Sequence, residues 1–174
     1  CVIMCIVNLW VCPVQSATPA SSTTIESPED CSISVIAVLA REISCHGLND
    51  GIITTSVSGG TAPFTYSWSN GTSTSGIGSA SAGNYTITVT DVQGCEATDQ
   101  ILVSQPSAIT LSMEVNNATS NSSNGRATVE ASGGTGNISY QWSTGANSAT
   151  LASLTSGIYR VTASDQNGCS TSAN

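Results

Sequence analysis

The sequence repeats itself at a fixed spacing, and this repeat limits the possible folds more than any other feature of the chain. The shift that carries Gly51 onto Gly125 aligns the chain with itself without a gap. It also matches 58–61 with 132–135, 66–69 with 140–143, Asp91 with Asp165, and 94–95 with 168–169. A fixed period of this kind is typical of tandem structural units. We therefore expect two similar domains, a first copy at 31–104 and a second copy at 105–174.

Both copies consist of short segments rich in Val, Ile, Thr and Tyr, separated by Gly-, Asn- and Asp-containing turns. The predicted strands cover 32–39, 51–58, 64–69, 72–79, 85–90 and 95–104 in the first copy, and 108–115, 125–131, 138–143 and 159–164 in the second. Short strands at about ten-residue spacing, with no helical period, predict an all-β fold. The fold class we expect is two tandem immunoglobulin-like antiparallel β-sandwiches.

Two pairs of aromatic residues favour the immunoglobulin-like arrangement. Trp68 and Trp142 lie in the middle of equivalent strands, where a core ring is expected. Tyr85 and Tyr159 follow tight turns at the start of a late strand, as the tyrosine of a tyrosine corner does. All four residues are predicted to be core aromatics.

The second copy differs from the first at its end. The first copy continues through the apolar run 101–103, which has no counterpart because the sequence stops at Asn174. We therefore predict that the second sandwich lacks its last strand. An open strand edge over an incomplete core is a site at which another strand can pair.

Charge excludes two classes of partner. The chain has no lysine, and its basic residues are Arg41, Arg126 and Arg160, against eleven acidic residues, which gives a net charge of −8. Nucleic-acid binding needs clustered Lys and Arg, and so does attraction to an anionic membrane surface. We expect neither partner.

Seven cysteines indicate an oxidising compartment outside the cytosol. Cys45 and Cys95 stand at the two ends of the first copy, and we predict a disulfide between them. The residue that matches Cys45 in the second copy is Thr119, which leaves Cys169 without an internal partner. Cys1, Cys5 and Cys12 are candidates for an intersubunit disulfide with Cys169, and the partner of Cys31 stays open.

Residues 1–12 are almost entirely apolar, yet they are too few to cross a bilayer as a helix. Three interpretations remain: a packed β-strand with two apolar faces, a remnant of a signal peptide, and an N-terminal cysteine that carries a lipid. Residues 13–30 are rich in Pro, Ser and Thr, and we expect an extended linker. Fully extended, this linker would reach roughly 55–60 Å.

Three segments of the first copy, 58–71, 81–91 and 94–95, resemble the SprB-type repeat of Bacteroidetes surface adhesins. The resemblance covers roughly 40–105 strongly and 115–171 more loosely. It implies an extracellular, non-enzymatic β-sandwich module, used in gliding adhesins and other long surface proteins. Family members usually carry many repeats in one chain, whereas this sequence has two behind an apolar, cysteine-rich segment.

No residue pattern indicates an enzyme, and we expect no cofactor and no metal. The single histidine, His46, follows a cysteine that we expect in a disulfide, so it lacks a thiolate to activate. Asp91 and Asp165 each precede a Gly-containing turn and are predicted to form Asx-type hydrogen bonds there. One acid per turn does not supply the six or more oxygens of a calcium site.

Two functions fit these observations. In the first, the protein is an extracellular filament subunit, and the N-terminal strand of one molecule completes the second sandwich of the next by head-to-tail strand exchange. Its donor face would comprise Ile3, Cys5, Val7, Leu9 and Val11. In the second, the chain is an adhesive module cut from a long cell-surface or gliding adhesin, with surface carbohydrate as a partner. Both place the protein outside the cell.

Overall fold

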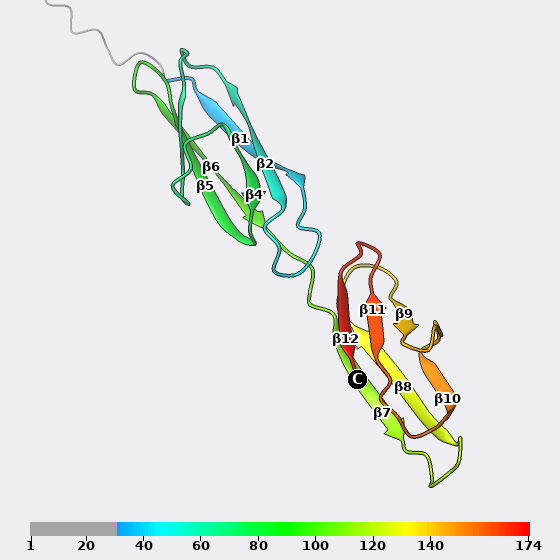
Figure 1. The fold of residues 1–174 in the computed structure, drawn as a ribbon. Helices are drawn as coiled ribbons and strands as arrows, with labels where there is room; N and C mark the ends of the chain where they lie inside the picture. The colour runs from blue at the N-terminus through cyan, green and yellow to red at the C-terminus, as the bar shows by residue number, and fades with distance from the viewer. Residues whose placement is uncertain (1–30) are drawn as a thin grey trace, which may run out of the picture. The chain divides into compact units, whose positions relative to one another are not determined.

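A computed structural model describes residues 31–174 and consists of twelve β-strands with no helix in that range. The strands form two sandwiches of six strands each (Figure 1). The first sandwich contains β1 (Ser34–Arg41), β2 (Gly51–Ser58), β3 (Thr65–Trp68), β4 (Gly76–Ala80), β5 (Gly83–Thr90) and β6 (Glu96–Val103). The second contains β7 (Thr110–Asn116), β8 (Gly125–Ser132), β9 (Ser139–Trp142), β10 (Thr150–Leu154), β11 (Val161–Ser164) and β12 (Ser170–Ala173). The predicted all-β sandwich class is confirmed. Residues 1–12 and the linker 13–30 lie outside the described residues.

The first sandwich has one sheet in the order β1-β2-β4 and another in the order β3-β5-β6, with every pair antiparallel. The alternation that predicted the strands also builds the core, because every second residue of a strand points to the same face. In β5, Tyr85, Ile87 and Val89 are buried while the residues between them are partly exposed. Ile53 and Val103 meet them within the same buried cluster.

The second sandwich repeats this topology, with sheets in the order β10-β8-β7 and β12-β11-β9. Its buried cluster has fewer members: Ala127, Val129, Trp142, Leu151 and Val161. Strand β11 has four residues where β5 has eight. The second sandwich therefore has the same plan as the first with a smaller core.

The last strand of the second sandwich, which we predicted to be missing, is present in a short form. Strand β12 pairs with β11 from Ser164↔Ser170 to Val161↔Ala173. It corresponds to the first half of β6, and the counterparts of residues 101–103 are not part of the sequence. Four residues after the turn at Gly168 are enough to form these pairs, so the prediction that the last strand is missing was wrong.

The four predicted aromatics occupy equivalent places in the two cores. Trp68 and Trp142 are 3% and 2% exposed, and each indole N–H donates to a carbonyl six residues later, that of Thr74 at 2.9 Å and that of Ser148 at 2.8 Å. The hydroxyls of Tyr85 and Tyr159 each donate to a carbonyl four residues upstream at 3.1 Å. Both tyrosine corners are thus formed. Tyr85 is buried, whereas Tyr159 is only partly buried.

Candidate functional site

The same aspartate-centred turn occurs once in each sandwich and places a cysteine at its end. In the first, one carboxylate oxygen of Asp91 accepts the N–H groups of Gln93 and Cys95, both at 2.9 Å, and the other accepts that of Thr61 at 2.9 Å. Gly94 closes the turn with a φ of 87°, in the left-handed region that favours glycine. The predicted Asx-type turn is confirmed here.

The second sandwich reproduces these contacts. Asp165 accepts the N–H groups of Asn167 and Cys169 at 2.9 Å and that of Thr135 at 2.8 Å, and Gly168 has a φ of 83°. Both aspartates are buried, at 6% and 7% exposure. The two turns therefore present Cys95 and Cys169 at equivalent positions, and what differs between the copies is the partner of each cysteine.

The disulfides of the structure differ from the predicted ones. Cys95 pairs with Cys31, and Cys169 pairs with Cys45. The predicted Cys45–Cys95 bond is therefore wrong. Cys169 is joined within its own chain, which also contradicts an intersubunit bond to Cys1, Cys5 or Cys12, three residues outside the described range.

The strand layout explains why Cys45 cannot reach Cys95. Cys95 directly precedes β6, while Cys45 lies in the loop between β1 and β2, at the end of the sandwich where β6 finishes. The eight residues of β6 span about 25 Å at the usual rise of a strand. The Cα atoms of a disulfide are normally within about 7 Å of each other. The two bonds that form have Cα separations of 5.5 and 5.7 Å.

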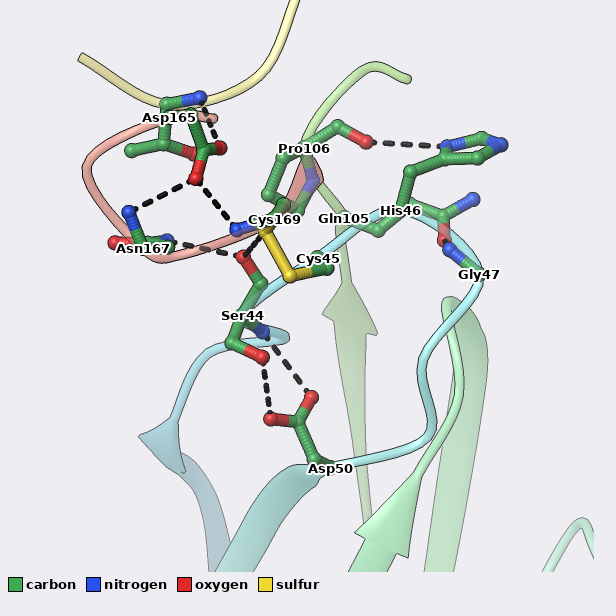
Figure 2. The surroundings of a disulfide bond; sticks show 11 residues. Ser44, Cys45, His46, Gly47, Asp50, Gln105, Pro106, Asp165, Asn167 and Cys169 are labelled. Carbon is green, nitrogen blue, oxygen red and sulfur yellow. Dashed lines mark hydrogen bonds between the residues drawn. A yellow bond between two sulfur atoms is a disulfide. The ribbon is translucent and has the colours of Figure 1, made fainter. Parts of the chain in front are cut away.

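The Cys45–Cys169 bond joins the two sandwiches, and polar contacts surround it (Figure 2). The Asn167 side-chain amide donates to the Ser44 carbonyl at 3.0 Å. The Gly47 N–H donates to the Gln105 side-chain oxygen at 2.7 Å. Exposed His46 has its Nδ1 3.2 Å from the Pro106 carbonyl, so Nδ1 carries the proton in this contact.

The loop that carries Cys45 is itself fixed by Asp50. The Ser44 hydroxyl and the Ser44 N–H both donate to the Asp50 carboxylate, at 2.7 and 3.1 Å (Figure 2). These bonds, the hydroxyl bond first, hold the pKa of Asp50 below its usual range. Arg41 Nε donates to the Asp50 carbonyl at 2.8 Å. These contacts fix the loop on both sides of Cys45.

The other carboxylates with lowered pKa values are also hydrogen-bond acceptors within the fold. The Thr61 N–H is the main cause of the lowered pKa of Asp91. The Ala37 N–H, which links β1 to Asp99 of β6 at 2.8 Å, is the main cause of the lowered pKa of Asp99. Each carboxylate is therefore held in its charged form by the backbone N–H groups it organises. This is a structural role for the acidic residues.

A groove of about 480 Å³ lies beside the short strand β12 in the second sandwich. Its walls include Met113, Ala127, Leu154 and Tyr159, and Asn174 lies at its rim. In the first sandwich, Val103 of β6 pairs with Gly83 at the equivalent position and is 1% exposed. The counterpart of buried Ile43 is exposed Asn117. The groove is therefore the place that the second half of β6 fills in the first sandwich.

The predicted donor residues Ile3, Cys5, Val7, Leu9 and Val11 lie outside the described residues. Within 31–174, no group of three or more His, Cys, Asp or Glu side chains is arranged to hold a metal ion. The same range contains no helix long and apolar enough to cross a membrane.

Comparison with known families agrees with the repeat seen in the sequence and in the fold. The family model for the SprB repeat matches residues 40–73 and again 114–147. The two matches are related by the same shift that carries Gly51 onto Gly125, and each begins near the end of a first strand and ends after the central tryptophan strand. A search of curated proteins found no match. The SprB repeat is a structural repeat of surface adhesins and not an enzyme family, and its family model matches this chain in two tandem copies.

Proposed function

We propose that the protein is an extracellular structural module of the cell surface, in which two SprB repeats act as one spacer. The observation that carries this proposal is the Cys45–Cys169 disulfide, because it fastens one repeat to the next. Disulfides of this kind persist outside the cytosol. The absence of lysine and the net charge of −8 favour a solvated surface over a nucleic-acid or anionic-membrane partner.

A spacer role is favoured over direct carbohydrate binding by the positions of the aromatic side chains. Sugar-binding sites usually need an exposed aromatic face, but Trp68 and Trp142 are buried. Tyr66 and Tyr140 are partly buried and pack against the two cores. Among the described residues, no tryptophan or tyrosine is therefore fully exposed for stacking against a sugar.

Surface location is tested on intact cells of the native host. Antibodies against residues 31–174 are expected to label unpermeabilised cells, and external protease is expected to remove the label. A cytosolic marker protein in the same cells serves as the control and should stay unlabelled. Label that appears only after permeabilisation would contradict the proposal.

A second candidate function, a filament subunit, is favoured by the groove in the second sandwich. In this hypothesis residues 1–12 of one molecule pair with Gly157–Tyr159 of the next, as residues 101–103 pair with Gly83–Tyr85 in the first sandwich. Ile101 and Val103 reach the core two residues apart. The donor face Ile3, Cys5, Val7, Leu9 and Val11 offers apolar residues at the same spacing.

Deleting residues 1–12 is expected to abolish filaments and to leave both sandwiches folded, since none of the twelve described strands includes these residues. Electron microscopy measures filaments, and far-ultraviolet circular dichroism measures the fold. The control replaces Ile3 and Val7 with threonine, which keeps the length of the N-terminal segment and makes its predicted donor face less apolar. Filaments from the deleted chain, or no filaments from the full chain, would exclude strand donation by this segment while leaving the spacer proposal intact.

A further inference from the structure

We infer that the Cys45–Cys169 disulfide is a mechanical bypass, which carries tension past strands β2–β11 of the two sandwiches instead of through them. The inference rests on the proposed role as a surface spacer, because a tethered surface module is pulled along its chain. Its basis is the order of the bonded cysteines in the sequence. Cys45 lies near the start of the described residues and Cys169 near their end.

Tension that enters before residue 31 and leaves after residue 174 follows the shortest covalent path. That path runs along the backbone from Cys31 to Cys45, crosses the disulfide to Cys169, and continues to Asn174. Of the twelve described strands, only β1 and β12 lie on it. Strands β2–β11 lie inside the closed loop, where pulling the ends cannot extend them.

The chain that the disulfide keeps from extending is much longer than the chain that remains free to extend. The bonded cysteines are 124 residues apart, and at about 3.4 Å per extended residue the loop holds back about 420 Å of chain. The open path contains about 19 residue steps, or about 65 Å when fully extended. The bond therefore makes most of the described chain inextensible even after its strands separate.

The Cys31–Cys95 disulfide does not provide this bypass. It closes a loop of 64 residues that lies within the first sandwich and contains Cys45. With the Cys45–Cys169 bond in place, the shortest path is the same whether or not Cys31 and Cys95 are joined. Without the Cys45–Cys169 bond, tension crosses from Cys31 to Cys95 and then extends 95–174, about 270 Å of chain. Removal of one disulfide is thus expected to give a different extended chain length from removal of the other.

The β1–β2 loop is fixed in a way that suits a bond under load. Ser44 is bonded to Asp50 through both its hydroxyl and its N–H, and its carbonyl accepts from Asn167 of the second sandwich. Cys169 is held from the other side by the Asp165 turn. Both cysteines are therefore flanked by residues that hydrogen bonds hold in place (Figure 2).

Single-molecule force spectroscopy of the full chain tests the bypass, with handles at its two ends and with Cys1, Cys5 and Cys12 replaced by serine in every version. Residues 1–30 add the same length each time. Without reductant, residues 31–174 of this parent chain are expected to extend to about 65 Å. Cys45→Ser with Cys169→Ser should reach about 270 Å, and the parent in reductant should reach about 490 Å.

The matched control is Cys31→Ser with Cys95→Ser, which loses a disulfide but keeps the bypass, and should also stop at about 65 Å. The inference is overturned if the parent chain without reductant extends by hundreds of ångströms, or if the Cys45→Ser, Cys169→Ser chain matches the parent. The length depends on which disulfides have formed, so it does not require the strands of a variant to stay folded while the chain is pulled. A chain found inside the cell would contradict the surface proposal and leave these lengths unchanged.

Discussion

Loss of the Cys31–Cys95 disulfide is expected to lower the free energy of unfolding of the first sandwich by about 4 kcal/mol. The bond closes a loop of 64 residues, and in the chain-entropy model a loop of this size restricts the unfolded chain by about that amount. Small domains are stable by only about 5–15 kcal/mol. The bond therefore supplies a large share of the stability of this sandwich.

The measurement compares two proteins that differ only at this bond. Both carry Cys45→Ser and Cys169→Ser, with Cys1, Cys5 and Cys12 also replaced by serine, and one additionally carries Cys31→Ser and Cys95→Ser. Urea unfolding is followed by the fluorescence of Trp68, with Trp10 and Trp142 replaced by phenylalanine in both. Without reductant the midpoints should differ, and with reductant the difference should become much smaller. Equal midpoints under both conditions would show that the bond does not stabilise the fold.

Features set by short stretches of sequence could be predicted well. The strands around Trp68 and Trp142, the tyrosine corners and the Asp91 and Asp165 turns depend on residues within a few positions of one another. Strand β10 (Thr150–Leu154) was not predicted, although the shift that relates the two copies carries β4 onto it. Its sequence, TLASL, has Thr150 as its single β-branched residue and no aromatic one, so the β-pattern there is weak without the comparison.

The disulfides could not be read from the order of the cysteines, because pairing depends on which end of a sandwich each one occupies. Cys45 and Cys95 mark the ends of one copy in sequence and also its opposite ends in space. One signal was present: the counterpart of Cys31 in the second copy is Gln105. Cys169 therefore lacks the partner that Cys95 has, and the loop of the preceding repeat supplies one instead.

The same comparison explains the error about the final strand. The shift that relates the two copies matches only 96–100 of the β6 region with residues of the second copy, and it does not show how many residue pairs are needed for a strand to form. Four pairs between β11 and β12 suffice. The core of the second sandwich nevertheless remains smaller, and this difference determines the response of the two sandwiches to the loss of a core side chain.

Replacing Trp142 with alanine is expected to unfold the second sandwich and leave the first intact. The side chain is 2% exposed and packs with Val129 and Val161, and its indole N–H bonds the Ser148 carbonyl. Removal of a buried tryptophan costs about 3–5 kcal/mol. Because this sandwich has a small buried cluster and a four-residue last strand, we expect that cost to approach its whole stability.

The two tryptophans make the outcome directly measurable when Trp10 is replaced by phenylalanine in every version. In the Trp142→Ala chain, Trp68 should keep the blue-shifted emission of a buried indole while the circular dichroism signal of strand falls by about half. The matched variant Trp68→Ala removes the equivalent side chain from the larger core, so the first sandwich should remain folded with a lowered urea midpoint. If both variants lose the same fraction of strand, the shortened β12 does not weaken the second sandwich, and the groove beside it is a surface feature without effect on the core.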